Sequence, residues 1–316
     1  MKDKSCICIG HLRILDHLIL GITNLKLKNN ELSASHSNLE IKSMNSWDQV
    51  IDGLREQSIN GAFIPAPIAM DLFASGLDIR LLMFAHRSGS VIVKNKNLNM
   101  EEIADFKGKT ILVPSRLSIQ NMLLHKLLSS ANLKFSSHND TSADVTQEIV
   151  NPFLMNEMLK NDRDHDIAGF AVAEPFGTKA VLDKIADKIC TSHSLWKNHP
   201  CCVFVLNTSF MNENPEAVQE IVSLFTHTGH SIEKSDRSEN FNLAQEFLGH
   251  KKEEIEYILL RTDISFSPSL LVPDLEALNI IQNYMVDVMG VLKNKIDVNL
   301  LVDSSYILDI ISENKF

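Results

Sequence analysis

Two serines stand where a helix is expected to begin, and their position could hold an anion. Ser115 and Ser118 follow the apolar run 110–113 and precede segment 119–128, whose apolar residues recur with helical spacing. The first turn of a helix exposes backbone N–H groups and the positive end of the helix dipole, which favour a carboxylate, sulfonate, nitrate or bicarbonate group. A serine in this place is also the ordinary N-cap of a helix, and both interpretations stay open.

Small and polar residues follow other expected strands and extend this candidate site. Ligands of open α/β sheets bind outside the carboxyl ends of the strands. Lys197 lies in one such loop and could provide a countercharge, although a lone lysine is also commonly a solvated surface group. The residues that we expect to bind a ligand are Arg13, Asp16, His17, Pro65, Ala66, His86, Ser88, Ser115, Ser118, Glu174 and Lys197.

The five cysteines form neither a metal-binding nor a disulfide pattern. They are Cys6, Cys8, Cys190, Cys201 and Cys202, an odd number without repeated C-x-x-C spacing. Cys6 and Cys8 alternate along one expected strand, and the vicinal Cys201 and Cys202 belong to another, so we expect mostly buried thiols. Because the twelve histidines are also scattered along the chain, the sequence predicts no metal site.

Cofactor motifs are incomplete or missing. Gly108-Lys109-Thr110 ends like a phosphate-binding loop, but the glycine that this motif needs five residues earlier is Ile103, and the segment precedes its strand. The patterns G-x-G-x-x-G, H-E-x-x-H and G-x-S-x-G do not occur. We therefore expect no cofactor and no catalytic residues of these classes.

Composition excludes several partners. The 316 residues carry 30 Lys and Arg against 40 Asp and Glu, a formal charge of −10, which is opposite to the bias of most nucleic-acid-binding proteins. No run approaches the ~18–20 apolar residues of a membrane span. The first residues contain no apolar signal region, so the chain is expected to be either cytoplasmic or a mature form whose signal was removed.

The order of elements predicts an α/β protein. Apolar runs typical of strands, around 6–10, 39–43, 61–64, 79–85, 110–113, 167–172 and 201–206, alternate with helical patterns. Strands alternating with helices favour parallel sheets. After residue 207, the segments 215–232, 240–248, 252–260, 273–289 and 297–311 all carry helical patterns, so the last third of the chain is expected to be mostly helical.

The chain resembles the periplasmic substrate-binding proteins of nitrate/sulfonate/taurine-type ABC transporters, including their nitrate and bicarbonate branch. The order and spacing of several short motifs carry the resemblance over nearly the whole chain. These motifs are Gly10-His11-Leu12 with Asp16-His17, Trp47-Asp48-Gln49-Val50, and the segments 61–67, 106–114, 173–176, 196–202, 214–218 and 300–306.

This resemblance implies a two-lobe, periplasmic-binding-protein-like fold of type II with two chain crossings. Residues 1–88 plus 205–316 would form a discontinuous first lobe, and residues 89–204 an inserted second lobe. The ligand would lie between the lobes, held by the loops named above. Closure about crossings near Ser88 and Val205 would produce the form that a transporter recognises.

The function implied is that of a monomeric, non-catalytic solute-binding protein in the periplasm or another extracytoplasmic compartment. It would deliver a small anion, such as nitrate, bicarbonate or a sulfonate, to the permease and ATPase of an ABC transporter. Two alternatives use the same architecture. One is a cytoplasmic ligand-sensing domain, and the other is an enzyme similar to those of thiamine-precursor synthesis, in which His11, His17 and Glu174 would be the acid/base candidates.

Overall fold

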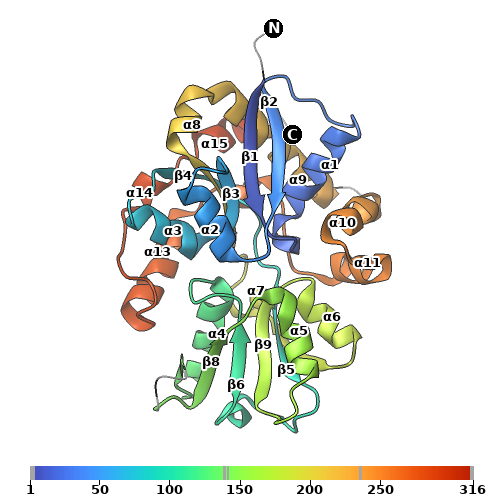
Figure 1. The fold of residues 1–316 in the computed structure, drawn as a ribbon, viewed down its shortest axis with the longest axis vertical. Coiled ribbons are helices and arrows are strands. Elements are labelled where there is room, and N and C mark those ends of the chain that lie inside the picture. Colours follow the sequence, from blue (N-terminus) through green and yellow to red (C-terminus); the bar gives the residue numbers. More distant parts are fainter. Residues whose placement is uncertain (1–3, 138–139, 141, 235–236, 314–316) are drawn as a thin grey trace.

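Two β-sheets organise the computed structural model, which describes residues 4–137, 140, 142–234 and 237–313. The first sheet has the order β2-β1-β3-β11-β4 and the second the order β10-β5-β9-β6-β8-β7. We call each sheet with the helices that pack on it a lobe, and Figure 1 shows the first lobe above the second. The fold is therefore α/β with two separate sheets, as expected from the sequence.

Four of the five strands in the first sheet come from the beginning of the chain, and one comes from its middle. β1 runs parallel to β2 and β3, whereas β11 runs antiparallel to β3 and β4. The sheet is thus mixed rather than parallel throughout. The strands are β1 (Ser5–His11), β2 (Ser37–Ser43), β3 (Gly61–Pro65), β4 (Ile79–Phe84) and β11 (Cys202–Asn207).

The second sheet is built from the segment between β4 and β11. β6, β7, β8 and β9 are parallel, and β5 runs antiparallel to both β9 and β10. Its strands are β5 (Ser90–Asn95), β6 (Thr110–Val113), β7 (Phe135–Ser137), β8 (Val145–Ile149), β9 (Ile167–Ala173) and β10 (Ala186–Thr191).

The chain crosses between the lobes twice, at residues 85–89 and 196–201. The boundary expected between residues 204 and 205 divides β11, whose pairing with β3 and β4 begins at Cys202. The return crossing therefore ends before Cys202. At the first crossing, Gly89 adopts a φ of +92°, and an added Cβ would lie 2.8 Å from the Ile264 side chain, so glycine is required there.

Helices cover both sheets. An aromatic triad marks the core of the first lobe, because Phe63 of β3, Phe204 of β11 and Phe225 of α9 stack with centroid separations of 5.3–5.4 Å. The helices before residue 200 are α1 (Leu18–Lys28), α2 (Trp47–Arg55), α3 (Ala66–Ala74), α4 (Ile119–Ser130), α5 (Pro152–Lys160), α6 (Phe176–Leu182) and α7 (Ser192–Leu195), with the short turns η1 (Leu15–His17) and η2 (Ile103–Phe106).

All named elements after β11 in the described chain are helical, which confirms the expected helical last third. The segment 297–311 is not one helix, however, because Val302 forms a bridge to Leu81 and the N–H of Asp303 donates to the Leu81 carbonyl at 2.9 Å. The helical elements are α8 (Thr208–Glu213), α9 (Pro215–Lys234), η3 (Arg237–Asn240), α10 (Phe241–Leu248), α11 (Lys252–Arg261), α12 (Pro268–Leu271), α13 (Leu275–Asn283), η4 (Tyr284–Val288), α14 (Val298–Leu301) and α15 (Ser305–Ser312).

None of the described helices combines the length and apolar character that crossing a membrane requires.

Candidate ligand-binding site between the lobes

Loops from both sheets enclose a small cavity of about 10 Å³ between the lobes, which we call the central cavity. The segments that wall it follow β1, β2 and β3 and begin β11 in the first lobe, and they follow β6, β8 and β9 in the second. The site is therefore at the carboxyl ends of strands, where open α/β sheets bind ligands. Its lining residues are Ile14, Asp16, Trp47, Pro65 and Cys202 from the first lobe and Pro114, Gln120, Pro152 and Ala173 from the second.

The cavity wall offers hydrogen-bond donors and one carboxylate. The indole Nε1 of Trp47 is buried and has no hydrogen-bond partner among the described residues. The amide Nε2 of Gln120 donates to Ser90 Oγ at 2.9 Å and lies 3.5 Å from Cys201 Sγ. Asp16 is 1% exposed, and its Oδ1 lacks a partner in the described part of the chain. An unpaired buried polar atom is unfavourable, so a ligand that satisfies these atoms would stabilise the site.

Asp16 forms a buried ion pair with His86. The Asp16 Oδ2 to His86 Nε2 distance is 3.2 Å, and both side chains are at most 1% exposed. Burial alone would lower the pKa of His86, but the charge of Asp16 and its hydrogen bond outweigh burial and raise that pKa to about 10. With His86 protonated, the pair adds no net charge to the cavity wall.

Three further histidines are buried near this pair and are neutral. Desolvation lowers the pKa of His11 and of His199 to about 4 and that of His17 well below its usual range. The Nδ1 atoms of His11 and His17 each lie 2.9 Å from the Leu12 carbonyl, and that of His199 lies 3.0 Å from the Pro200 carbonyl. Since a carbonyl only accepts, Nδ1 of His11 and of His199 carries the proton and Nε2 presents a lone pair. Nδ1 of His17 also lies 3.2 Å from the backbone nitrogen of Leu12, which is a donor.

The structure places several sequence-predicted residues at or behind the cavity. Asp16 and Pro65 line it, and the N–H of Ala66 donates to the Cys201 carbonyl at 2.9 Å. His17 packs against Trp47 with a centroid separation of 5.8 Å. Ser88 lies at the first crossing, where its hydroxyl is 3.0 Å from His193 Nδ1.

The two serines before α4 form local hydrogen bonds, and Ser118 is the N-cap of the helix. Ser118 Oγ accepts from the N–H of Asn121 at 3.2 Å and donates to the Ser115 carbonyl at 2.8 Å. Ser115 Oγ accepts from the N–H of Leu117 at 3.1 Å. Of the two interpretations of this segment, the N-cap is the one that the hydrogen bonds show, and the adjacent Pro114 rather than either serine lines the central cavity.

Arg13 and Lys197 are exposed and do not line the central cavity. Arg13 lies between the buried Leu12 and Ile14, so its side chain points outward, and its Nε donates to Ser43 Oγ at 3.2 Å. The countercharge that the sequence assigned to Lys197 would have to come from another residue.

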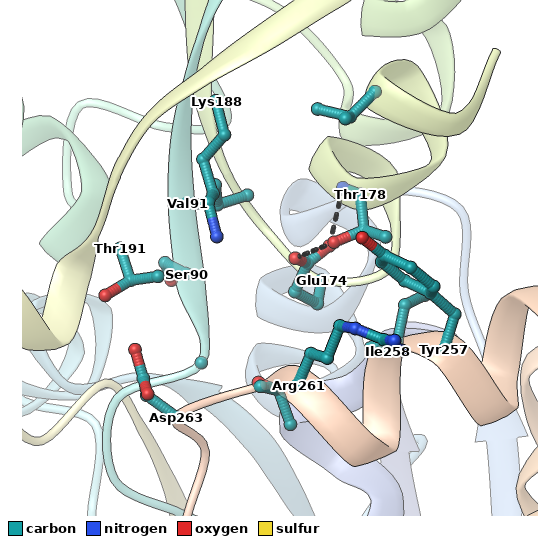
Figure 2. Close-up of a pocket in the computed structure, with 13 residues that line it drawn as sticks. Ser90, Val91, Glu174, Thr178, Lys188, Thr191, Tyr257, Ile258, Arg261 and Asp263 are labelled. Atoms are coloured by element: carbon teal, nitrogen blue, oxygen red, sulfur yellow. Dashed lines mark hydrogen bonds between the residues drawn. The ribbon is translucent and has the colours of Figure 1, made fainter.

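Two cationic residues that the sequence did not single out lie in a second pocket of about 70 Å³, shown in Figure 2, which we call the Lys188 pocket. Lys188 of β10 reaches in from the second lobe, and Arg261 at the end of α11 borders it from the first. Both are exposed residues on polar faces, so no sequence signal separates them from solvated side chains. The lining also includes Gly89, Ser90, Val91, Glu174, Thr178, Val181, Thr191, Tyr257, Ile258, Thr262 and Asp263.

The two pockets adjoin each other. Gln120 of the central cavity donates to Ser90, which lines the Lys188 pocket. Glu174 is buried at this junction and accepts from the N–H and the hydroxyl of Thr178 at 2.9 and 2.5 Å. Burial raises the pKa of Glu174, against the lowering effect of the Thr178 hydrogen bonds.

Solved structures share this two-lobe arrangement. The nitrate-binding protein NrtA of Synechocystis PCC 6803 superposes with a TM-score of 0.83 at 16% identity, covering 98% of this chain and 89% of that one. A ligand-binding component of an ABC-type import system from Staphylococcus aureus, solved with zinc bound, gives 0.83 at 20% identity and covers 97% and 99%. The alkanesulfonate-binding protein SsuA of Xanthomonas axonopodis gives 0.75 at 15% identity and covers 96% and 99%. These likenesses confirm the expected periplasmic-binding-protein fold.

Curated relatives match part of the chain. The nitrate import ATP-binding protein NrtC of Synechocystis sp. is 27% identical over 187 residues, which are 54% of this chain and 27% of that protein. The nitrate/nitrite binding protein NrtA of Nostoc sp. is 29% identical over 96 residues, which are 30% and 21%. The chain thus spans about a quarter of the length of these relatives. The NMT1-like family model matches residues 7–247, well over half of the chain, and this protein belongs to the NMT1-like family.

Proposed function

We propose that this protein is the solute-binding component of an ABC importer and captures a small anion between its lobes. The observation that carries the proposal is the central cavity, whose walls come from the strand ends of both sheets. Support comes from the relatives named for nitrate import and from the structural neighbours named for nitrate and sulfonate binding. The permease and ATPase of an importer would be the partners, and an extracytoplasmic location would follow.

The central cavity is small in this structure. Its volume of about 10 Å³ is close to the minimum of about 10–15 Å³ that one water molecule needs. A ligand of a few heavy atoms, such as nitrate, bicarbonate or a short sulfonate, would therefore enter while the lobes are apart, and the lobes would close less tightly around it than in this structure. The unpartnered indole N–H of Trp47 would donate to one of the ligand's oxygens.

Electrostatics are compatible with an anion although an aspartate lines the cavity. The charge of Asp16 is balanced by His86 at 3.2 Å. The adjoining pocket contains Lys188 and Arg261, together with Asp263 and the buried Glu174. The two cations would help to draw an anion toward the cleft.

The cavity between the lobes can hold a ligand without any catalytic step. The loops of either lobe supply only half of the cavity wall, so a ligand gains its full set of contacts when the lobes are closed. The ligand therefore stabilises the closed form, which an importer would then recognise. We propose the protein as a non-enzymatic monomer that needs no partner chain to complete the site.

Titration calorimetry with nitrate, bicarbonate and methanesulfonate, with chloride as the reference anion, tests this proposal. We expect one anion to bind per chain. Trp47→Phe should bind it at least about tenfold more weakly than the unsubstituted protein, because a hydrogen bond to a charged group is worth about 1.5–3 kcal/mol. Trp196→Phe, which alters the second of the two tryptophans, is the matched control. Absence of binding for the whole panel overturns the anion assignment, and equal affinity in the two variants overturns the placement in the central cavity.

A further inference from the structure

Four potential metal ligands converge beside the central cavity, outside the hydrogen bonds that the proposed function uses. One ligand atom each from Asp16, His86, Cys201 and Cys202 lies within 4.8 Å of all the others, and all four residues are buried. They come from three places in the fold: the turn after β1, the first chain crossing, and the end of the second crossing. The tertiary structure, and not their spacing in the sequence, brings these four residues together.

The three separations from Asp16 match those of ligands around one tetrahedral ion. Asp16 Oδ2 lies 3.2 Å from His86 Nε2, 3.5 Å from Cys201 Sγ and 3.6 Å from Cys202 Sγ. Zinc bonds of about 2.0 Å to oxygen, 2.0–2.1 Å to nitrogen and 2.3 Å to sulfur imply tetrahedral edges of about 3.3 Å for O···N and about 3.5 Å for O···S. The imidazole and the two thiols lie within 4.8 Å of one another and would move closer together around a bound ion.

Hydrogen bonds alone do not satisfy both polar neighbours of His86 Nε2 in this cluster. His86 Nε2 faces the Asp16 carboxylate at 3.2 Å and also the backbone N–H of Cys202 at 3.3 Å. A proton on Nε2 suits the carboxylate but opposes the N–H, and a lone pair does the reverse. A bound cation would remove the conflict among the side chains. The imidazole, the carboxylate and the thiolates would then all direct lone pairs at the same ion.

We propose that Asp16, His86, Cys201 and Cys202 form a tetrahedral binding site for Zn²⁺. Two thiolates, one imidazole and one carboxylate are the ligand types that zinc takes, and four protein ligands make the site a closed, structural one. Gln120 Nε2, 3.5 Å from Cys201 Sγ, supplies an outer hydrogen bond to one thiolate. The sequence predicted no metal site because its criterion was local spacing, which these ligands lack.

The position of the site gives the metal a defined role. His86 and Cys201 belong to the two chain crossings, and Asp16 belongs to the loop after β1. A bound ion would connect both crossings to the first lobe and stabilise the fold. Asp16 and Cys202 also line the central cavity, so the ion would form part of its wall without occupying it.

Metal binding by the reduced full-length protein, treated with a chelator and measured without any anion present, tests the site independently of the proposed function. We expect one equivalent of Zn²⁺ or Co²⁺, an increase in Tm with Zn²⁺, and Co²⁺ absorption bands typical of tetrahedral thiolate coordination. Substoichiometric binding, or a Co²⁺ spectrum without thiolate bands, overturns the proposal. A disulfide between Cys201 and Cys202 that persists under reducing conditions also overturns it.

Ligand variants give the second readout. Cys201→Ser and Cys202→Ser should weaken Zn²⁺ affinity more than about 100-fold, since even outer-shell changes cost about 10- to 100-fold. Cys190→Ser, at a thiol of β10 outside the cluster, should leave it unchanged. If the ligand variants do not fold, X-ray absorption of the unsubstituted zinc-loaded protein decides: two sulfur and two nitrogen or oxygen neighbours support the site, and a shell without sulfur overturns it.

Discussion

The backbone N–H of Leu15 donates to the carbonyl of Glu174 at 2.9 Å, which joins the turn after β1 in the first lobe to the loop after β9 in the second. The neighbours of these two residues, Asp16 and Ala173, line the central cavity. The hydrogen bond therefore forms only when the lobes are together, and it closes the cavity at the point where the strand ends meet. The structure represents the closed form of the protein.

A second contact between the lobes makes closure testable. Lys179 of α6 and Glu254 of α11 form an ion pair at 3.2 Å. Glu254→Gln removes this attraction from the closed form only, so we expect anion affinity to fall by about two- to fivefold, as for a partly exposed ion pair. The measurement is titration calorimetry at low salt, because screening reduces the difference at high salt.

The control for this variant lies on the same helix. Glu256 pairs with Lys252 at 3.7 Å within α11, and within the described part of the chain it forms no ion pair between the lobes. Glu256→Gln should therefore leave the affinity unchanged. Equal losses in the two variants would show that the helix, rather than the contact between the lobes, is responsible.

Lys188, rather than Lys197, is expected to attract the anion. Lys188 lines the pocket that adjoins the central cavity, whereas the Lys197 side chain is exposed away from both pockets. Lys188→Met should lower anion affinity by about threefold to tenfold, with a smaller difference at high salt, and Lys197→Met should have little effect. The opposite order of effects, measured by calorimetry at two salt concentrations, would restore the sequence-based assignment of Lys197.

Glu220 of α9 is expected to stabilise the first lobe in a pH-dependent manner. Its carboxylate accepts from the N–H groups of Ser35, His36 and Ser37 and from the Ser37 hydroxyl. Burial opposes ionisation, but these hydrogen bonds outweigh it and lower the pKa of Glu220. A lowered carboxyl pKa contributes stability above the unfolded-state pKa of about 4.3, and this contribution disappears as the pH falls through the folded-state pKa.

Glu220→Gln tests that contribution. We expect a loss of about 1 kcal/mol in the free energy of unfolding at pH 7, a value reduced for solvent screening, and a smaller loss below pH 4. The exposed Glu213→Gln serves as the control. Urea unfolding at both pH values makes the comparison, and a loss that does not change with pH would contradict the role of the charge.

His11 should make the protein sensitive to mild acid. Its pKa of about 4 in the folded state lies below the usual 6.5, because the imidazole is desolvated. Between these values the unfolded state binds more protons, so stability falls as the pH drops from about 6.5 to about 4. His11→Phe keeps a ring against Phe247, 5.3 Å away, and removes the titration.

The expected readout is the difference in unfolding free energy between pH 7.5 and pH 4.5. It should be smaller in His11→Phe than in the unsubstituted protein by about 2–3 kcal/mol. His227→Gln, at an exposed site on α9, should behave like the unsubstituted protein. An unchanged pH dependence in His11→Phe would mean that His11 does not stay neutral in the folded state.

Local patterns predicted the elements well where the apolar spacing was strong. The helical segments 215–232, 240–248 and 252–260 correspond to α9, α10 and α11, and the apolar run 110–113 is β6. The elements α3, α5, β8 and β10 were not predicted, because α3 is buried on most sides and the others are short or half-exposed, so their periodicity is weak. The break between α14 and α15 depends on the bridge from Val302 to Leu81, a contact that no local pattern contains.

The candidate site was harder to predict than the fold. Asp16 and Pro65 were found because strand-end loops of an α/β sheet meet at one edge. Trp47 was missed because its role depends on its indole N–H lacking a partner after folding, and Gln120 because it lies within a helix and not in a strand-end loop. Likewise, the ion pair of Asp16 with His86 and its contacts with Cys201 and Cys202 exist only in the tertiary structure.

Solution X-ray scattering with and without saturating anion tests the central claim that a solute is captured between the lobes. The account predicts a smaller radius of gyration for the complex, approaching that calculated from the closed structure, and a weaker response in Trp47→Phe at the same anion concentration. An anion that binds one-to-one while the radius of gyration stays constant, or changes equally in Trp47→Phe, would contradict capture in the central cavity.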